Sequence, residues 1–150
     1  MHPLNFPLLN IQLRQKEGVQ QVWDVVRKKW IVLTPEEWVR QHLIQYLNGE
    51  KGFSLNLMAV ERNVKVNGMN RRYDLVVHDN SGKPLLLAEC KAPDIKLAQS
   101  TFEQAARYNM TMRVPYLLIT NGLEHFCCKI DFEKNNYSFL QEIPSKEDLL

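Results

Sequence analysis

The sequence predicts a mixed α/β domain, with helices packed on a central sheet. Three apolar segments separated by turn signals follow one another over residues 55–90, as expected for adjacent strands. Two segments with helical spacing of apolar residues, 35–47 and 97–110, stand on either side of these strands in the chain. This order is typical of a sheet covered by helices, and 150 residues suit one domain with a real core.

The composition is that of an ordinary globular protein, with 45% hydrophobic and 24% charged residues. The net charge is only +2, so contact with nucleic acid would need a local basic patch. The three cysteines, Cys90, Cys127 and Cys128, lack zinc or CxxC spacing, which predicts a cytoplasmic protein. A secretory signal and an apolar run of roughly 20 residues are both missing, so no membrane segment is expected.

The first 33 residues are predicted to form a β-rich extension, with a turn at Lys16-Glu17-Gly18. Residues 34 to about 125 are expected to form the core, and 126–150 a C-terminal hairpin and tail. The β-rich segments of the extension are 9–13, 22–26 and 30–33.

The first helix is predicted to begin at Thr34, which is a good N-cap followed by Pro35 at the first helical position. Glu37 completes a Thr-x-x-Glu capping box, which would account for its side chain. Asn48-Gly49 ends the helix. Its expected buried stripe is Val39, Leu43, Ile44 and Leu47.

The next three segments are predicted to form an antiparallel meander. They are Leu55–Val66, Arg72–His78 and Pro84–Cys90, with hairpin turns at Asn67-Gly68 and over 79–82.

The rest of the chain is predicted to add a second helix and three further strands. The helix 97–110 has Phe102, Ala105, Ala106 and Asn109 on one stripe. The strands are Val114–Thr120, which reads as buried, and a closing hairpin of Glu124–Asp131 and Tyr137–Leu140 around Asn135-Asn136.

Charged residues end the third strand of the meander, although its other residues are apolar. Strand alternation places Glu89 and Lys91 on one face and Cys90 on the other, where Cys90 is expected to be a small buried residue. Pairing across the preceding turn puts Asp74 opposite about residue 87, within one pleat of Glu89. An edge strand with a surface Glu–Lys pair would show the same pattern.

Two carboxylates this close would repel each other unless a cation lies between them. Oxygen ligands at this density suit Mg²⁺ or Mn²⁺. Lys91 would then stand beside the metal, where it could orient a water molecule or offset the charge of a phosphate.

Three further residues fall where they could join this site. Glu36 lies on or beside the buried stripe of the first helix, although helix-dipole stabilisation would also explain it. Gln104 and Tyr108 share one face of the following helix, where a polar helix face is the alternative.

Taken in order, these residues resemble the PD-(D/E)xK nuclease superfamily, and more narrowly the N-terminal nuclease domain of type I restriction enzyme R subunits. The resemblance rests on "TPEEWVRQHLI" with Glu36, "RRYDLVV" with Asp74, "LLLAECKAP" with Glu89 and Lys91, and "FEQAARYN" with Gln104 and Tyr108. The last stretch is the QxxxY element associated with the type I group. The resemblance covers roughly residues 30 to 125.

The resemblance implies a restriction-endonuclease-like mixed sheet flanked by helices and Mg²⁺-dependent hydrolysis of phosphodiester bonds. It implies that Asp74, Glu89 and the backbone carbonyl of Cys90 ligate the metal, and that Glu36 supports it or a second metal. Lys91 would position or activate the attacking water. Gln104 and Tyr108 would shape the site or touch the substrate.

The sequence departs from the resembled pattern in two places. Tyr73 replaces the proline of the superfamily's name, where only the aspartate does chemistry. R subunits carry an ATP-driven motor, whereas GxxxxGK[ST] is missing here, so no ATP site is expected in this chain. A stand-alone nuclease-like protein and a fragment both fit.

Three interpretations of function stay open. The first is a metal-dependent DNA endonuclease or exonuclease, the second a catalytically silent nucleic-acid-binding or assembly module, and the third a structural protein. DNA versus RNA, a homodimer and a missing partner subunit are likewise open. Basic residues near the site that could bind phosphate are Arg62, Lys65, Arg71, Arg72 and Arg107, of which Arg71, Arg72 and Arg107 are the candidates retained.

Overall fold

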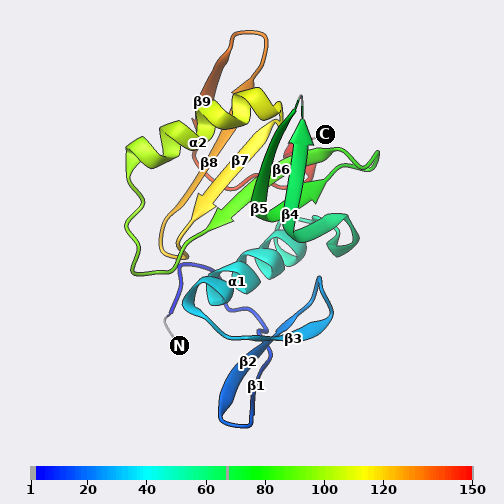
Figure 1. The fold of residues 1–150 in the computed structure, drawn as a ribbon, viewed down its shortest axis with the longest axis vertical. Helices are drawn as coiled ribbons and strands as arrows, with labels where there is room; N and C mark the ends of the chain where they lie inside the picture. The colour runs from blue at the N-terminus through cyan, green and yellow to red at the C-terminus, as the bar shows by residue number, and fades with distance from the viewer. Residues whose placement is uncertain (1–2, 67, 150) are drawn as a thin grey trace.

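The computed structural model describes residues 3–66 and 68–149, and it divides the strands between two sheets (Figure 1). A three-stranded sheet near the N-terminus has the order β1-β2-β3, and a six-stranded sheet has the order β4-β5-β6-β7-β8-β9. The predicted mixed α/β architecture is therefore confirmed. In the described part of the chain, no helix is both long and apolar enough to cross a membrane.

The small sheet is antiparallel and consists of β1 (Leu13–Lys16), β2 (Val19–Asp24) and β3 (Lys29–Val32). Glu17 and Gly18 have φ angles of 52° and 79°, as a type I′ hairpin turn requires. The first strand does not cover 9–13 as predicted. Residue 11 would have to pair with Asp24, the last residue of β2. The Asp24 carboxylate instead accepts the N–H groups of Val26 and Arg27 in the next turn.

Helix α1 (Pro35–Gly49) begins as predicted, because the Thr34 hydroxyl accepts the Glu37 N–H at 3.0 Å. The predicted stripe is buried. The Glu37 side chain is not used for capping, however. Its carboxylate accepts hydrogen bonds from Arg27, Arg40 and Gln41, because a buried carboxylate is stabilised far more by cationic donors than by one backbone N–H.

The large sheet is antiparallel except between β6 and β7, which run parallel and are joined through helix α2 (Gln99–Met112). The predicted meander and the closing hairpin are both present. Asn67, of the first predicted turn, lies outside the described residues. The strands are β4 (Met58–Val66), β5 (Met69–His78), β6 (Pro84–Cys90), β7 (Tyr116–Thr120), β8 (His125–Asp131) and β9 (Asn136–Leu140), and short 3-10 turns cover Leu55–Leu57 and Glu147–Leu149.

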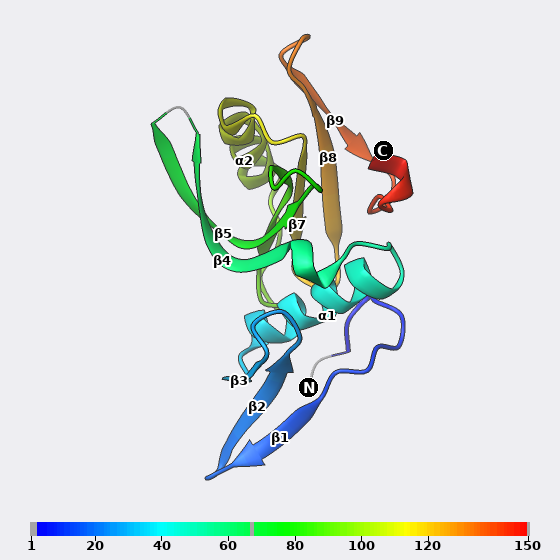
Figure 2. The same cartoon turned by 90° about the vertical axis from the view of Figure 1, so that its right-hand side faces the viewer.

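The two helices cover opposite faces of the large sheet. The face toward α1 is apolar and includes Leu75 and Leu86, whereas the face toward α2 includes Val76 and Leu87. Figure 2 shows the β4–β5 hairpin curling past the α2 side of the sheet. The predicted α2 stripe, Phe102, Ala105, Ala106 and Asn109, is buried in that concave face.

Candidate active site

The pairing of β5 with β6 decides how the proposed acidic residues meet. The ladder pairs Leu75 with Ala88, and continuing it by one residue sets Asp74 opposite Glu89. The predicted partner was about residue 87, which is wrong by two positions. The register shifts between Val77 and His78, and the turn closes on a bond between Asp79 N–H and the Lys83 carbonyl, so the second strand begins later than assumed.

Asp74 fills the end of this ladder with its own side chain. Its Oδ2 accepts the Cys90 N–H at 2.6 Å, and its Oδ1 lies 4.0 Å from Arg40 Nη1. The same guanidinium donates to the Asp74 carbonyl at 3.3 Å. The bond to Cys90 fixes the carboxylate beside the end of β6, and the side chain keeps 27% of its surface exposed to a ligand.

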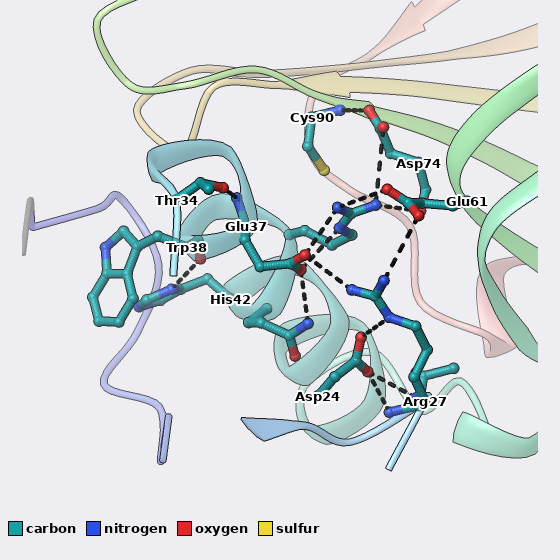
Figure 3. Close-up of polar contacts among 12 residues, drawn as sticks. Asp24, Arg27, Thr34, Glu37, Trp38, His42, Glu61, Asp74 and Cys90 are labelled. Carbon is teal, nitrogen blue, oxygen red and sulfur yellow. Dashed lines mark hydrogen bonds and ion pairs between the residues drawn. The ribbon is translucent and has the colours of Figure 1, made fainter. Parts of the chain in front are cut away.

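Arg40 links Asp74 to a network of charges that the sequence did not predict. Figure 3 shows Asp24, Arg27 and Glu37 of this network beside Asp74. Arg40 binds Glu37 in a two-pronged fork, with Nε to Oε2 at 2.9 Å and Nη2 to Oε1 at 3.0 Å. Arg27 also donates to Glu37 at 2.9 Å and is held by Asp24. Burial opposes the charge of Arg40, but the negative groups around it, Glu37 first among them, together outweigh burial and raise the pKa of Arg40. The network therefore connects the small sheet, α1 and the middle of β5.

Glu61 sits in β4 opposite Asp74, where the β4–β5 pairing skips one position. Its φ of 53° is left-handed, which costs a non-glycine residue roughly 1–2 kcal/mol. The carboxylate lies 2.8 Å from Arg72 and 3.6 Å from Arg40. Burial would raise its pKa, but the charge of Arg40 and the other guanidinium groups lowers it. Arg72, proposed to bind phosphate, therefore already has an acidic partner.

Glu89 faces the α2 side of the sheet and is bound by the Arg71 guanidinium. Arg71 also lies over two rings, at 5.2 Å from the Tyr73 centroid and 5.0 Å from the Tyr108 centroid. Tyr108 is thus linked to Glu89 through Arg71, and its role in shaping the site stays a prediction. Gln104 is exposed on α2.

Glu36 and Lys91 approach the Asp74 side of the site. Glu36 is exposed, yet partial burial and the charge of Asp74 raise its pKa, while Lys91 opposes this rise. Lys91 is anchored by its backbone N–H, which donates to Thr120 at 2.8 Å. None of the ion pairs in the described part of the chain involves its ammonium group. Glu89 and Lys91 line one cavity of about 690 Å³.

The remaining candidates are placed as follows. Cys90 is buried on the face opposite Glu89, as predicted, and burial raises the pKa of its thiol. Arg107 is exposed on α2. Among the described residues, no group of three or more His, Cys, Asp or Glu side chains is arranged to hold a metal ion. A cation shared by Asp74 and Glu89 stays a prediction.

The fold and this site define a mixed α/β domain with acidic and basic side chains gathered at the end of one strand hairpin. A family model described as type I restriction enzyme R protein N terminus (HSDR_N) matches residues 35–144. The chain therefore belongs to the family of type I restriction enzyme R protein N-terminal domains, as its motifs predicted.

A solved structure has a similar fold. It is a fragment structure assigned to an HsdR subunit of a type I restriction enzyme from Vibrio vulnificus YJ016. The two share 19% sequence identity with a TM-score of 0.54, and the similarity covers 78% of this chain and 24% of that chain. Among curated proteins, no sequence matches.

Proposed function

We propose that this chain hydrolyses phosphodiester bonds of DNA, using a divalent metal ion bound at Asp74. The observation that carries the proposal is the register of β5 and β6, which sets Asp74 opposite Glu89 with Lys91 two residues further on. DNA is the proposed substrate because the family is that of a restriction enzyme. Other restriction subunits are the proposed partners, in the cytoplasm, where the three free cysteines would stay reduced.

The donors at this strand end fit Mg²⁺ or Mn²⁺. Mg²⁺ is usually held by one or two carboxylates, with water and substrate phosphate completing its shell. Burial, and after it the charge of Asp74, raises the pKa of Glu36, so its carboxylate lies close enough to Asp74 to feel its charge. Asp74, Glu89 and Glu36 would hold the ion, together with the Cys90 carbonyl, which strand geometry directs to the same side as the N–H bound by Asp74. A bound ion would supply Lewis-acid stabilisation of the phosphate and a more acidic water.

The side chains of the chain itself have separate roles in the proposed reaction. Lys91 orients the attacking water and offsets the charge that develops on the phosphate. Arg40 holds Asp74 from the α1 side, through contacts with the Asp74 carbonyl and carboxylate. Arg71 and Tyr108 keep Glu89 in place until substrate enters.

The test is cleavage of supercoiled plasmid and of single-stranded DNA, with Mg²⁺ or Mn²⁺, by the wild type and by Asp74→Asn. Asparagine keeps an oxygen to accept the Cys90 N–H but removes the charge. We expect cleavage by the wild type only. Equal cleavage by both proteins would point to a contaminating nuclease and against this site.

A second candidate is a DNA-binding module without turnover. The pairing of Glu89 with Arg71 favours it, because that cation occupies the carboxylate proposed to bind the metal. Arg71→Gln separates the two proposed functions. It should speed cleavage if Arg71 only blocks the metal. If the chain is a binding module, neither the wild type nor Arg71→Gln should cleave DNA.

A further inference from the structure

A cavity lies beside the end of β6, and most of the residues that line it have no role in the proposed hydrolysis at Asp74. Glu89 and Lys91 form one part of it. The rest comes from the loop before α2 and the start of that helix, and from β7, β8, β9 and the residue after β9. Phe102 is buried in its interior, whereas Phe139 is 49% exposed at its edge. At about 690 Å³ the cavity is within the range of small-ligand sites, roughly 300–1,000 Å³.

Three phenylalanine rings cluster along this wall. The Phe102 centroid lies 4.8 Å from that of Phe139 and 5.7 Å from that of Phe126. The Phe139 ring contacts Phe102 and Tyr137 and still keeps 49% of its surface exposed. Flat aromatic ligands such as nucleobases stack on exposed aromatic rings, whatever their sequence.

The cavity also carries positive charge at the same edge as the proposed reaction. Lys91 and Lys96 both belong to its wall. The negative charge of Glu89 is already offset by Arg71. An aromatic wall beside two ammonium groups complements a ligand with a flat base and an anionic phosphate.

We infer that this cavity holds one unstacked nucleobase of a DNA strand whose neighbouring phosphate lies at Glu89 and Lys91. The inference rests on the proposed function and narrows its substrate to single-stranded or unpaired DNA. In a duplex the base is stacked between its neighbours, so it reaches the cavity only after being extruded.

The experiment is fluorescence anisotropy with a labelled oligothymidine in EDTA, where no cleavage occurs. A strand of the same length made of abasic deoxyribose phosphates measures the contribution of the backbone alone. We expect Phe139→Ala to weaken binding of oligothymidine about 5- to 100-fold and to leave binding of the abasic strand unchanged. Phe132→Ala, at the β8–β9 turn, is the matched control and should bind both strands as the wild type does.

Two results would overturn the inference: equal affinity of Phe139→Ala and wild type for oligothymidine, or no preference of the wild type for oligothymidine over the abasic strand. Thermal unfolding checks that Phe139→Ala is folded. If it is not, Phe139→Leu, which keeps apolar volume without a ring, takes its place in the binding experiment. If either of these binding results is found and the chain still cleaves DNA with metal, the nucleobase site is refuted and the proposed nuclease function is kept. The expected binding without any cleavage would remove hydrolysis and keep the nucleobase site.

Discussion

The carboxylate of Asp74 accepts the backbone N–H of Cys90 at 2.6 Å, at the point where the ladder between β5 and β6 ends. A strand N–H that faces β5 normally meets a backbone carbonyl there, and here a side chain takes that place. Asp74 therefore completes the hydrogen bonding of the sheet and is also the proposed anionic ligand of the metal.

This double role makes two substitutions of Asp74 behave differently. Asp74→Ala leaves the Cys90 N–H without an acceptor, which should lower the free energy of unfolding by about 1–3 kcal/mol. Asp74→Asn keeps an acceptor, so its stability should stay near that of the wild type. Urea unfolding measures the stabilities, and Mn²⁺ titration followed by electron paramagnetic resonance measures the metal, which both variants should fail to bind. Equal stability of the two variants would contradict the structural role.

Lys91→Ala should reduce metal-dependent cleavage by about 10²–10³, because it removes one donor that stabilises charge on the phosphate. Binding to DNA should change little, since phosphate affinity comes from many basic residues. Plasmid nicking and anisotropy measure the two properties separately. Lys134→Ala, exposed at the β8–β9 turn, is the control, and an equal loss of cleavage in both variants would argue against a special role for Lys91.

Glu36→Gln should stabilise the protein near neutral pH in the absence of metal. The folded-state pKa of Glu36 is raised above 4.5 by burial and by Asp74, so its stabilising contribution is complete below that value and is lost as pH rises through the folded pKa. Glutamine does not suffer this loss, and the gain should vanish below pH 4.5. Thermal unfolding over this range measures it.

Mg²⁺ gives Glu36 a second, independent readout. If Glu36 supports the ion, Mg²⁺ should raise the melting temperature of the wild type more than that of Glu36→Gln. Exposed Glu133 provides the control, since Glu133→Gln should respond to pH and metal as the wild type does.

Arg40→Gln should cost about 3–5 kcal/mol of unfolding free energy, because it leaves the buried Glu37 carboxylate without its principal cation. Arg72→Gln is a matched change at an exposed ion pair with Glu61 and should cost at most about 1 kcal/mol. Urea unfolding of both variants checks this order. Similar losses would show that the Glu37 network contributes no more than a surface pair.

Asp24→Asn should lower stability near neutral pH by about 1.5–3 kcal/mol, because charged hydrogen bonds to Arg27 weaken. Burial would raise the pKa of Asp24, but bonds from Arg27 outweigh it and hold the pKa below 3.8. The contribution is therefore present above pH 3.8 and lost as pH falls through the lower folded value. Urea unfolding at several pH values should show the two proteins converging in acid, and a constant difference would contradict this.

Local patterns predicted the elements well, because caps, turns and periodicity are written in neighbouring residues. The bounds of β6, Pro84–Cys90, and the start of α1 after Thr34 are as predicted. The partners of Glu37 could not be predicted in the same way. They come from the turn after β2 and from α1 itself, and only the folded chain brings Arg27 to that helix.

The members of the site stay predictions, whereas the alternation and the register behind them can be compared with the structure. Alternation along β6 correctly separated Glu89 from Cys90. The register that sets Asp74 opposite Glu89 depends on a shift in strand pairing between Val77 and His78. No turn motif in the sequence predicts this shift. Arg40 and Glu61 were missed, although a buried-face arginine one turn after Glu36 and Glu37 was a signal that could have indicated a charged cluster.

The parallel pairing of β6 with β7 has a consequence for the order in which the site is assembled. Asp74 and Glu89 meet across a short hairpin, a local contact that closes early because little chain entropy is lost. Lys91 is anchored to Thr120, so its position waits until α2 and β7 have been made and docked. On the ribosome, the acidic pair would therefore exist before its lysine is fixed. Pulse-labelling hydrogen exchange during refolding should show the β5–β6 amides protected before the Lys91 amide, and simultaneous protection would refute this sequence of events.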